Sequence, residues 1–322
     1  MKTYKKFDSL IRGFYIIIGL ALFLAISSSI DSPTPLDVQQ DQITDIPAAV
    51  VQKPVEIKPE PPKPKPKITD YRYVALYGST LHRGLGSLGE QDLEATIVRA
   101  KKVAEQYQPF SEEPIKPSLE IITTVASAGP TDDGDYSQET DGGKLQAIIQ
   151  RAKEEDIYVI LDFQPGRDTF LDQLKQYESL LLEPHVGVGL DPEWRLLTPQ
   201  ARHLVTVGSV SAEELNQASS WLADLTKTHD LPQKIFMIHQ FKSMMIQNRE
   251  TLDTSRGELA YVIHVDGFGT LGQKRETWNK ITTGLPPNTH TAWKNFYDED
   301  LPTPTPGQTM QQTPKPLVIT YQ

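Results

Sequence analysis

From residue 70 to the C-terminus, short apolar segments alternate with longer amphipathic ones. The short segments are rich in β-branched and aromatic residues, which predicts strands. They span residues 71–77, 119–127, 157–163, 186–190, 234–240, 259–266, 291–297 and 317–321. Apolar residues at helical spacing between them predict helices at 93–107 and 144–155, and a third that Ser211 caps with Glu214 completing a capping box. Repeated prolines between 302 and 316 leave little room for a helix before the last strand.

Eight strands joined by crossover helices in about 250 residues predict an α/β fold of the closed (β/α)8 barrel (TIM) type over residues 70–322. An open doubly wound sheet is the alternative. Such sheets usually carry a glycine-rich phosphate turn after the first strand. Here Gly84, Gly86 and Gly89 follow that strand, but their spacing does not match GxGxxG. The barrel is therefore the favoured prediction.

The first 69 residues have a different pattern. Basic residues, among them Lys5, Lys6 and Arg12, precede an apolar run at 14–30, which is typical of a signal anchor or a signal peptide. The basic flank predicts that everything after residue 30 lies outside the cytoplasm. We favour an uncleaved anchor in the cytoplasmic membrane over residues 1–30, and cleavage near Ala25 would instead release a secreted protein. Residues 31–69 are rich in proline and predict a disordered, extended linker.

Composition narrows the classes of function. The formal net charge is -10, and an acidic surface repels nucleic acid, so no nucleic-acid partner is expected. The chain has no cysteine. Disulfides, cysteine–zinc sites, thiol catalysis and a lipid-modified N-terminal cysteine are therefore excluded.

Chemistry on a TIM-type barrel is expected at the C-terminal ends of the strands. Polar or aromatic residues end six of the predicted strands, and buried carboxylates need partners, so core packing does not explain them. We therefore predict a functional site made of these side chains: Tyr77 on the first strand; Asp162, Gln164 and Arg167 on the third; Asp191, Glu193 and Trp194 on the fourth; His239 and Gln240 on the fifth; His264 and Asp266 on the sixth; Tyr297 and Asp298 on the seventh.

The sharpest element is the sequence Asp191-Pro192-Glu193. On an extended segment, residues i and i+2 point to the same side, about 6–7 Å apart. Two carboxyl groups that close raise the pKa of one, so that it stays protonated beside an ionised neighbour. Glycosidic bond cleavage requires such a pair. Trp194 and Trp293 would offer flat surfaces for sugar rings, and this chemistry needs no cofactor.

Two resemblances follow from these residues. The D-x-E of the fourth strand, with Asp266 on the sixth, resembles lysozyme-type barrel glycoside hydrolases that cut peptidoglycan. The resemblance implies that Glu193 is the acid, that Asp191 and Asp266 support it, and that the partner is a carbohydrate or cell-wall polymer. This chain has Tyr77 where that family has an Asp on the first strand.

A broader resemblance rests on LDFQPGR, LDPEWR, LPQKIFMIHQF, HVDGFG and FYDED. These segments are similar to a family of secreted, lipoprotein-type actinobacterial proteins of no established activity. That resemblance implies secretion and the extent of the domain, and it names no substrate.

Two other functions stay open. Asp162, Asp191, Glu193, Asp266 and His239 would suit a divalent metal ion, which predicts a metal-dependent hydrolase of phosphodiesters or amides. A barrel that binds glycans without cleaving them is the other alternative. The acidic loop at 129–143 is predicted to form a flexible rim of the site.

Overall fold

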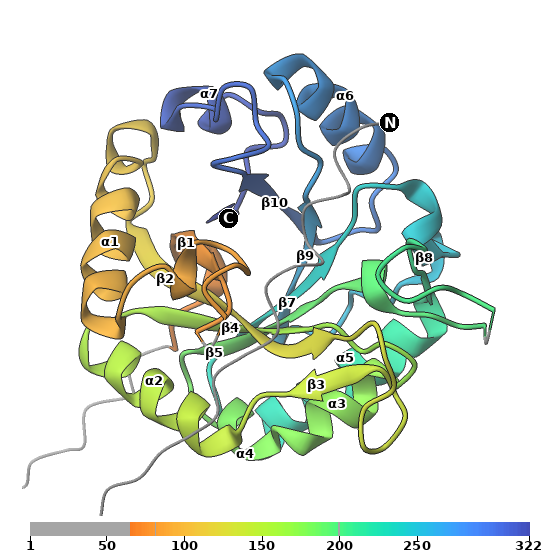
Figure 1. The fold of residues 1–322 in the computed structure, drawn as a ribbon. Coiled ribbons are helices and arrows are strands. Elements are labelled where there is room, and N and C mark those ends of the chain that lie inside the picture. Colours follow the sequence, from red (N-terminus) through yellow and green to blue (C-terminus); the bar gives the residue numbers. More distant parts are fainter. Residues whose placement is uncertain (1–64, 81, 199) are drawn as a thin grey trace, which may run out of the picture. The chain divides into compact units, whose positions relative to one another are not determined.

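The computed structural model describes residues 65–80, 82–198 and 200–322. The eight predicted segments form parallel strands that close into a barrel (Figure 1). The strands are β1 (Arg72–Gly78), β2 (Ile115–Ala126), β4 (Tyr158–Phe163), β5 (Val186–Leu190), β7 (Lys234–His239), β9 (Leu259–Val265), β10 (Thr289–Asn295) and β11 (Val318–Tyr321). β11 pairs with both β1 and β10, and β1 also pairs with β2. The predicted TIM-type barrel is confirmed, and the open sheet is excluded.

Helices surround the strands as an outer layer (Figure 1). They are α1 (Leu93–Glu105), α2 (Gly142–Glu154), α3 (Phe170–Gln176), α4 (Glu178–Leu181), α5 (Ala212–Thr228), α6 (Leu271–Thr282) and α7 (Pro306–Met310). Ser211 caps α5 as predicted, because its hydroxyl accepts the Glu214 N–H. The predicted capping box does not form, since the Glu214 carboxylate pairs with Arg195 at 3.0 Å instead. The proline-rich segment 302–316 does hold a short helix, α7, with Pro306 in its first turn.

Two connections depart from the simple strand–helix alternation. Within the described residues, the crossover from β7 to β9 contains no α-helix but two short 3-10 turns, η5 (Ser243–Met245) and η6 (Arg249–Thr251). Between these turns lies the short strand β8 (Ile246–Gln247), which pairs with β6 (Val210–Ser211). The Arg249 guanidinium holds this crossover by donating to the carbonyl oxygens of Ile281 and Thr283. β2 extends beyond the barrel, where it pairs with the antiparallel β3 (Ser137–Glu139).

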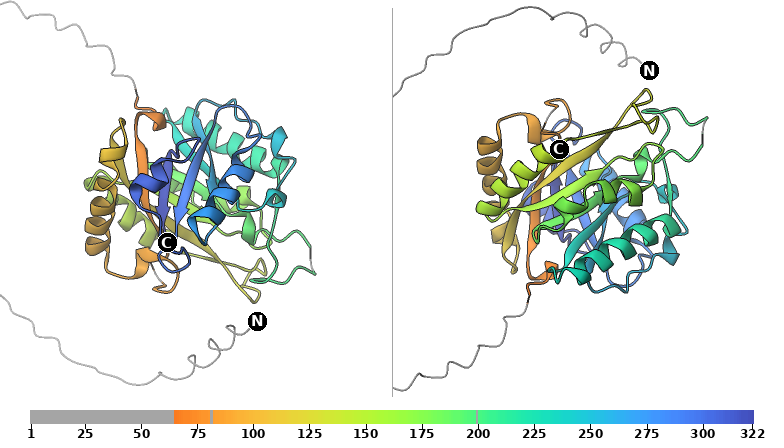
Figure 2. Two further views of the ribbon diagram at one scale, coloured as in Figure 1. Left: turned by 90° about the horizontal axis from the view of Figure 1, so that it is seen from above. Right: turned by 90° about the horizontal axis from the view of Figure 1, so that it is seen from below.

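The predicted membrane segment and most of the predicted linker lie outside the described residues. The compact unit that contains the barrel is Pro61–Gln322. Before β1, the turn η1 (Ile68–Asp70) packs on the end of the barrel where the strands begin (Figure 2). Ile68 is buried there, and its N–H donates to Gln233 Oε1 at 3.0 Å. None of the helices among the described residues is long and apolar enough to cross a membrane.

Candidate functional site

The barrel interior changes from apolar to polar along the strands. Because alternate residues of a strand point inward, each strand contributes an interior row. The lower positions are apolar and include Tyr158, Ile160, Met237, Val262 and Ala292. Towards the C-terminal ends, the eight strands contribute what we call the polar ring: Tyr77, Glu120, Asp162, Gly189, His239, His264, Lys294 and Thr320. All its side chains are almost inaccessible to solvent.

His239 is the hub of the polar ring. Its Nδ1 lies 3.1 Å from Asp266 Oδ2, and its Nε2 lies 2.9 Å from Glu120 Oε1 and 3.4 Å from Asp162 Oδ1. Burial by itself would lower the pKa of His239, but these carboxylates together raise it well above its ordinary value. The carboxylates around His239 therefore favour its protonated, imidazolium form.

His264 is the neutral partner of that imidazolium. Its Nδ1 lies 3.2 Å from His239 Nε2, and its Nε2 is hydrogen-bonded to Thr320 Oγ1 at 2.9 Å. Burial lowers the pKa of His264 well below its ordinary value, and the positive charges of His239 and Lys294 lower it further. The surroundings thus favour the protonated form of His239 and the neutral form of the adjacent His264.

Asp162 connects the imidazoles to the first strand. Its Oδ2 accepts the Tyr77 hydroxyl at 3.2 Å, and the Lys294 ammonium lies 3.5 Å from the centre of the Tyr77 ring. Burial raises the pKa of Asp162 to about 7. The charge of His239 lowers this pKa, and the negative charge of Glu120 raises it. Gln164 completes this side of the site, because its Nε2 donates to the Tyr77 hydroxyl at 3.4 Å.

Gly189 makes room for the carboxylates of the polar ring. A Cβ atom at this position would lie 3.0 Å from Asp162 Oδ1 and 3.4 Å from Glu120 Oε1. Gly189→Ala is therefore expected to cost about 1–3 kcal/mol of unfolding free energy, because packed interiors tolerate added volume poorly. Denaturant unfolding of the variant measures this cost. Gly257→Ala is the control, since a Cβ there meets nothing within 4 Å; equal effects of the two substitutions would contradict the packing argument.

Asp191 and Glu193 follow β5 directly. The segment is not extended as predicted, because Pro192–Trp194 forms the 3-10 turn η4 with Asp191 as its N-cap. Asp191 Oδ1 accepts the Glu193 N–H at 3.1 Å, so hydrogen bonding within the turn fixes the relation of the two residues. Burial raises the pKa of Asp191 well above its ordinary value. Burial and the charge of Asp266 also raise the pKa of Glu193, which is only half-buried.

Other predicted site residues lie apart from the polar ring. Gln240 makes two hydrogen bonds with the β7–β9 crossover. Its amide N–H donates to the Lys242 carbonyl, and its Oε1 accepts from the Arg249 guanidinium. Tyr297 stacks on Tyr321 with ring centres 5.3 Å apart, and Asp298 is exposed.

The two tryptophans predicted as sugar platforms differ in exposure. Trp194 is half-buried in η4. Trp293 is buried against Trp278, and its indole N–H donates to Asn295 Oδ1. Trp293 therefore does not face the mouth, because strand alternation turns it outward against α6.

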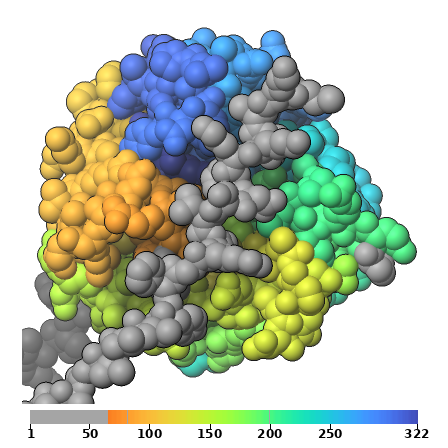
Figure 3. Space-filling view, in the orientation of Figure 1, coloured from red at the N-terminus to blue at the C-terminus, as the bar shows by residue number. Residues whose placement is uncertain are grey.

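The loops after β2, β4 and β5 form one side of the rim (Figure 3). Tyr136 stacks on His203 with ring centres 3.6 Å apart, and the Arg167 guanidinium carbon lies 4.4 Å from the Tyr136 centroid. The backbone N–H of Arg167 also donates to the Asp135 carbonyl at 2.7 Å. Arg167 is therefore a rim residue that joins two loops, and the acidic loop lies on the rim.

Prediction from strand ends missed three of the side chains in the polar ring: those of Glu120, Lys294 and Thr320. Glu120 was missed because the second strand was predicted to begin at residue 119, which placed Glu120 at the start of the strand and away from its C-terminal end. In the structure β2 begins at Ile115 and continues past the barrel. The available signal was period-two alternation, which places Lys294 inward with Ala292 and Thr320 inward with Val318.

Two groups of described side chains could hold a metal ion. Glu120, His239 and His264 form the buried group, and Asp133, Asp135 and Glu139 form a more exposed one on the rim. The sequence had predicted metal ligands at Asp162 and His239 but not at Glu120 or His264.

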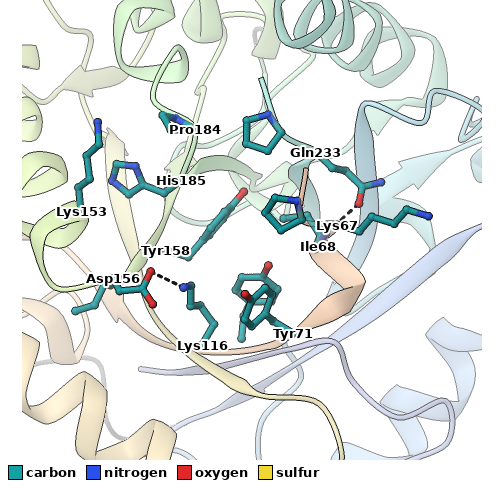
Figure 4. Close-up of a pocket in the computed structure, with 14 residues that line it drawn as sticks. Lys67, Ile68, Tyr71, Lys116, Lys153, Asp156, Tyr158, Pro184, His185 and Gln233 are labelled. Atoms are coloured by element: carbon teal, nitrogen blue, oxygen red, sulfur yellow. Dashed lines mark hydrogen bonds and ion pairs between the residues drawn. The ribbon is translucent and has the colours of Figure 1, made fainter. Parts of the chain in front are cut away.

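A separate pocket of about 340 Å³ lies at the opposite end of the barrel (Figure 4). Tyr71, Tyr158 and His185 line it together with Lys116, whose ammonium is paired with Asp156. Active sites of TIM-type barrels lie at the C-terminal ends of the strands, so we do not assign catalysis to this pocket.

Neither the protein-family models nor the curated proteins that were compared with the chain give a match. The site therefore has to be interpreted from its own residues.

Proposed function

We propose that this protein is a glycoside hydrolase that acts outside the cytoplasm on a cell-wall or other extracellular glycan. One observation carries the proposal. Glu193 is held at the C-terminal end of the barrel within the electrostatic influence of Asp266, and both burial and that charge favour its protonated form. A protonated carboxyl group beside a second carboxyl group is what glycosidic bond cleavage uses.

Glu193 is the proposed proton donor. As the glycosidic C–O bond breaks, the leaving oxygen takes the Glu193 proton and positive charge develops on the sugar ring. Asp266 is the proposed stabiliser of that charge. His239 fixes its Oδ2 through the 3.1 Å hydrogen bond, and its Oδ1 has no hydrogen-bond partner among the described residues. Water then adds to the anomeric carbon and passes its proton to a carboxylate.

Other residues have supporting roles in this proposal. Asp191 fixes the turn that carries Glu193 through the hydrogen bond to the Glu193 N–H. Trp194 follows Glu193 directly and is half-buried, so it is the proposed surface for a sugar ring. The basic and apolar N-terminal segment supports the extracytoplasmic location, because that pattern directs export.

The pH dependence of kcat/KM on isolated peptidoglycan tests the assignment of Glu193. A proton donor is active while protonated, so activity should be lost as pH rises through the raised pKa of Glu193. Asp266 raises this pKa, whereas Lys242 and Lys294 lower it. Asp266→Asn should therefore move the basic limb to lower pH, and Lys242→Gln should move it to higher pH.

Lys242 is exposed and has no proposed contact with the reacting atoms, so its substitution isolates the charge effect. New reducing ends released from the glycan measure the rate. If the basic limb moves in the same direction in both variants, Glu193 is not the acid. If no tested glycan releases reducing ends, the proposed function is wrong.

A further inference from the structure

Three buried ligand-type atoms, one each from Glu120, His239 and His264, lie within 4.8 Å of one another inside the polar ring, and Asp162 lies beside them. Measured from His239 Nε2, Glu120 Oε1 lies at 2.9 Å, His264 Nδ1 at 3.2 Å and Asp162 Oδ1 at 3.4 Å. Glu120 Oε1 and His264 Nδ1 are 3.8 Å apart. All four side chains are 0% exposed.

These separations fit one coordination geometry. Ligand atoms bound at about 2.0–2.1 Å to a tetrahedral zinc ion lie about 3.3 Å from one another. The three separations among Glu120 Oε1, His239 Nε2 and His264 Nδ1, at 2.9, 3.2 and 3.8 Å, lie on both sides of that value. We propose that Glu120, His239 and His264 form a binding site for one zinc-type divalent ion, with Asp162 beside it as a neighbouring carboxylate.

Unused hydrogen-bonding capacity supports the site. Within the described residues, Glu120 Oε2 and Asp162 Oδ1 have no hydrogen-bond partner although both are buried. A buried carboxylate oxygen without a partner costs free energy, and a cation beside it removes that cost. Glu120 belongs to the proposed ligands, and Asp162 Oδ1 lies 3.4 Å from another of them, His239 Nε2.

The surroundings orient the two histidine ligands and the neighbouring Asp162. His239 Nδ1 contacts Asp266 Oδ2 at 3.1 Å, His264 Nε2 contacts Thr320 Oγ1 at 2.9 Å, and Asp162 Oδ2 accepts the Tyr77 hydroxyl at 3.2 Å. Metal-bound histidines commonly use their second ring nitrogen in this way, which fixes the ring and the atom that faces the metal.

The donor atoms select the class of ion. Two imidazole nitrogens with one carboxylate oxygen suit Zn²⁺ and neighbouring transition metals, whereas Ca²⁺ and Mg²⁺ prefer oxygen ligands. Bound metal would offset the negative charge of Glu120 and of the neighbouring Asp162. It would also hold His239 and, through the 3.1 Å contact of His239 Nδ1, Asp266 against the proposed sugar site.

Metal binding can be measured without any substrate. Full-length protein, purified in detergent and treated with chelator, is titrated with Zn²⁺ by calorimetry and, separately, with Co²⁺ by visible spectroscopy. We expect one Zn²⁺ per chain with a Kd of about 1 µM or tighter, and the absorption of a four-coordinate Co²⁺ complex. A 100-fold excess of free Zn²⁺ over the Kd should raise the Tm by about 5–10 °C.

Isosteric variants locate the site. Glu120→Gln keeps the side-chain volume and removes an anionic ligand, and His264→Gln removes an imidazole; each should weaken Zn²⁺ binding by about 10²-fold or more. Asp133→Asn on the acidic rim and His203→Gln on the half-exposed imidazole are the controls, and both should bind as the parent protein does.

Failure of the metal proposal is distinct from failure of the glycosidase proposal. Absence of stoichiometric Zn²⁺ binding, or binding that Asp133→Asn weakens while Glu120→Gln and His264→Gln do not, would overturn the metal site. Neither result bears on whether Glu193 donates a proton to a glycan, because every readout here is binding, colour or thermal stability.

Discussion

Glu193→Gln is expected to lower kcat on peptidoglycan by about 10²–10⁴-fold, the usual contribution of a general acid. The substitution keeps the shape of the side chain and removes the transferable proton. Release of reducing ends under saturating substrate measures kcat. Thermal unfolding should change little, because Glu193 is half-buried and the turn is held by its backbone N–H on Asp191.

Glu139→Gln is the matched control for this variant. Glu139 is an exposed carboxylate on β3 at the rim, so its substitution tests whether any carboxylate near the mouth lowers the rate. We expect the control to keep the parent activity. Full activity of Glu193→Gln, or an equal loss in the control, would show that Glu193 is not the acid.

Removal of residues 316–322 is expected to abolish most of the free energy of unfolding of the domain. A domain of ordinary stability has an unfolding free energy of about 5–15 kcal/mol, so the expected loss is several kcal/mol. The deletion takes away β11, which pairs with β1 and β10 and buries Val318 and Ile319 completely. It leaves an unpaired edge on each neighbouring strand. Loss of a cooperative transition in calorimetry and circular dichroism would show the effect.

The control for this deletion removes Gln322 alone. That residue follows β11 and contributes two peripheral backbone hydrogen bonds, with Tyr297 and Asn295. A small decrease in Tm is expected. If the longer deletion kept the thermal midpoint of the parent, closure of the barrel by β11 would not be what stabilises the fold.

The barrel could be predicted from the sequence because each strand and helix is specified by residues that are neighbours along the chain. Each strand is a short β-branched segment, and the helix caps at Asp92, Ser211 and Thr270 are hydrogen-bonding residues placed where a helix begins. The prolines around α7 misled the prediction, because Pro306 occupies the first turn of a helix, where its missing N–H costs nothing.

The sequence predicted only part of the site. Strand ends pointed to Asp162, His239 and Asp266, which the structure brings into contact through His239. The same rule selected Gln240 and Tyr297, which lie outside the polar ring, because a strand end alone does not say which way a side chain turns.

What the sequence by itself determined is the order of the elements, the closed parallel barrel and the end of it where polar side chains gather. Only the tertiary structure decided which of those side chains meet. Glu120 lies far along the chain from His239, and their 2.9 Å contact depends on the stagger of the strands around the barrel and on the missing side chain at Gly189. Such contacts between distant strands are set by closure and packing, which no local pattern of residues encodes.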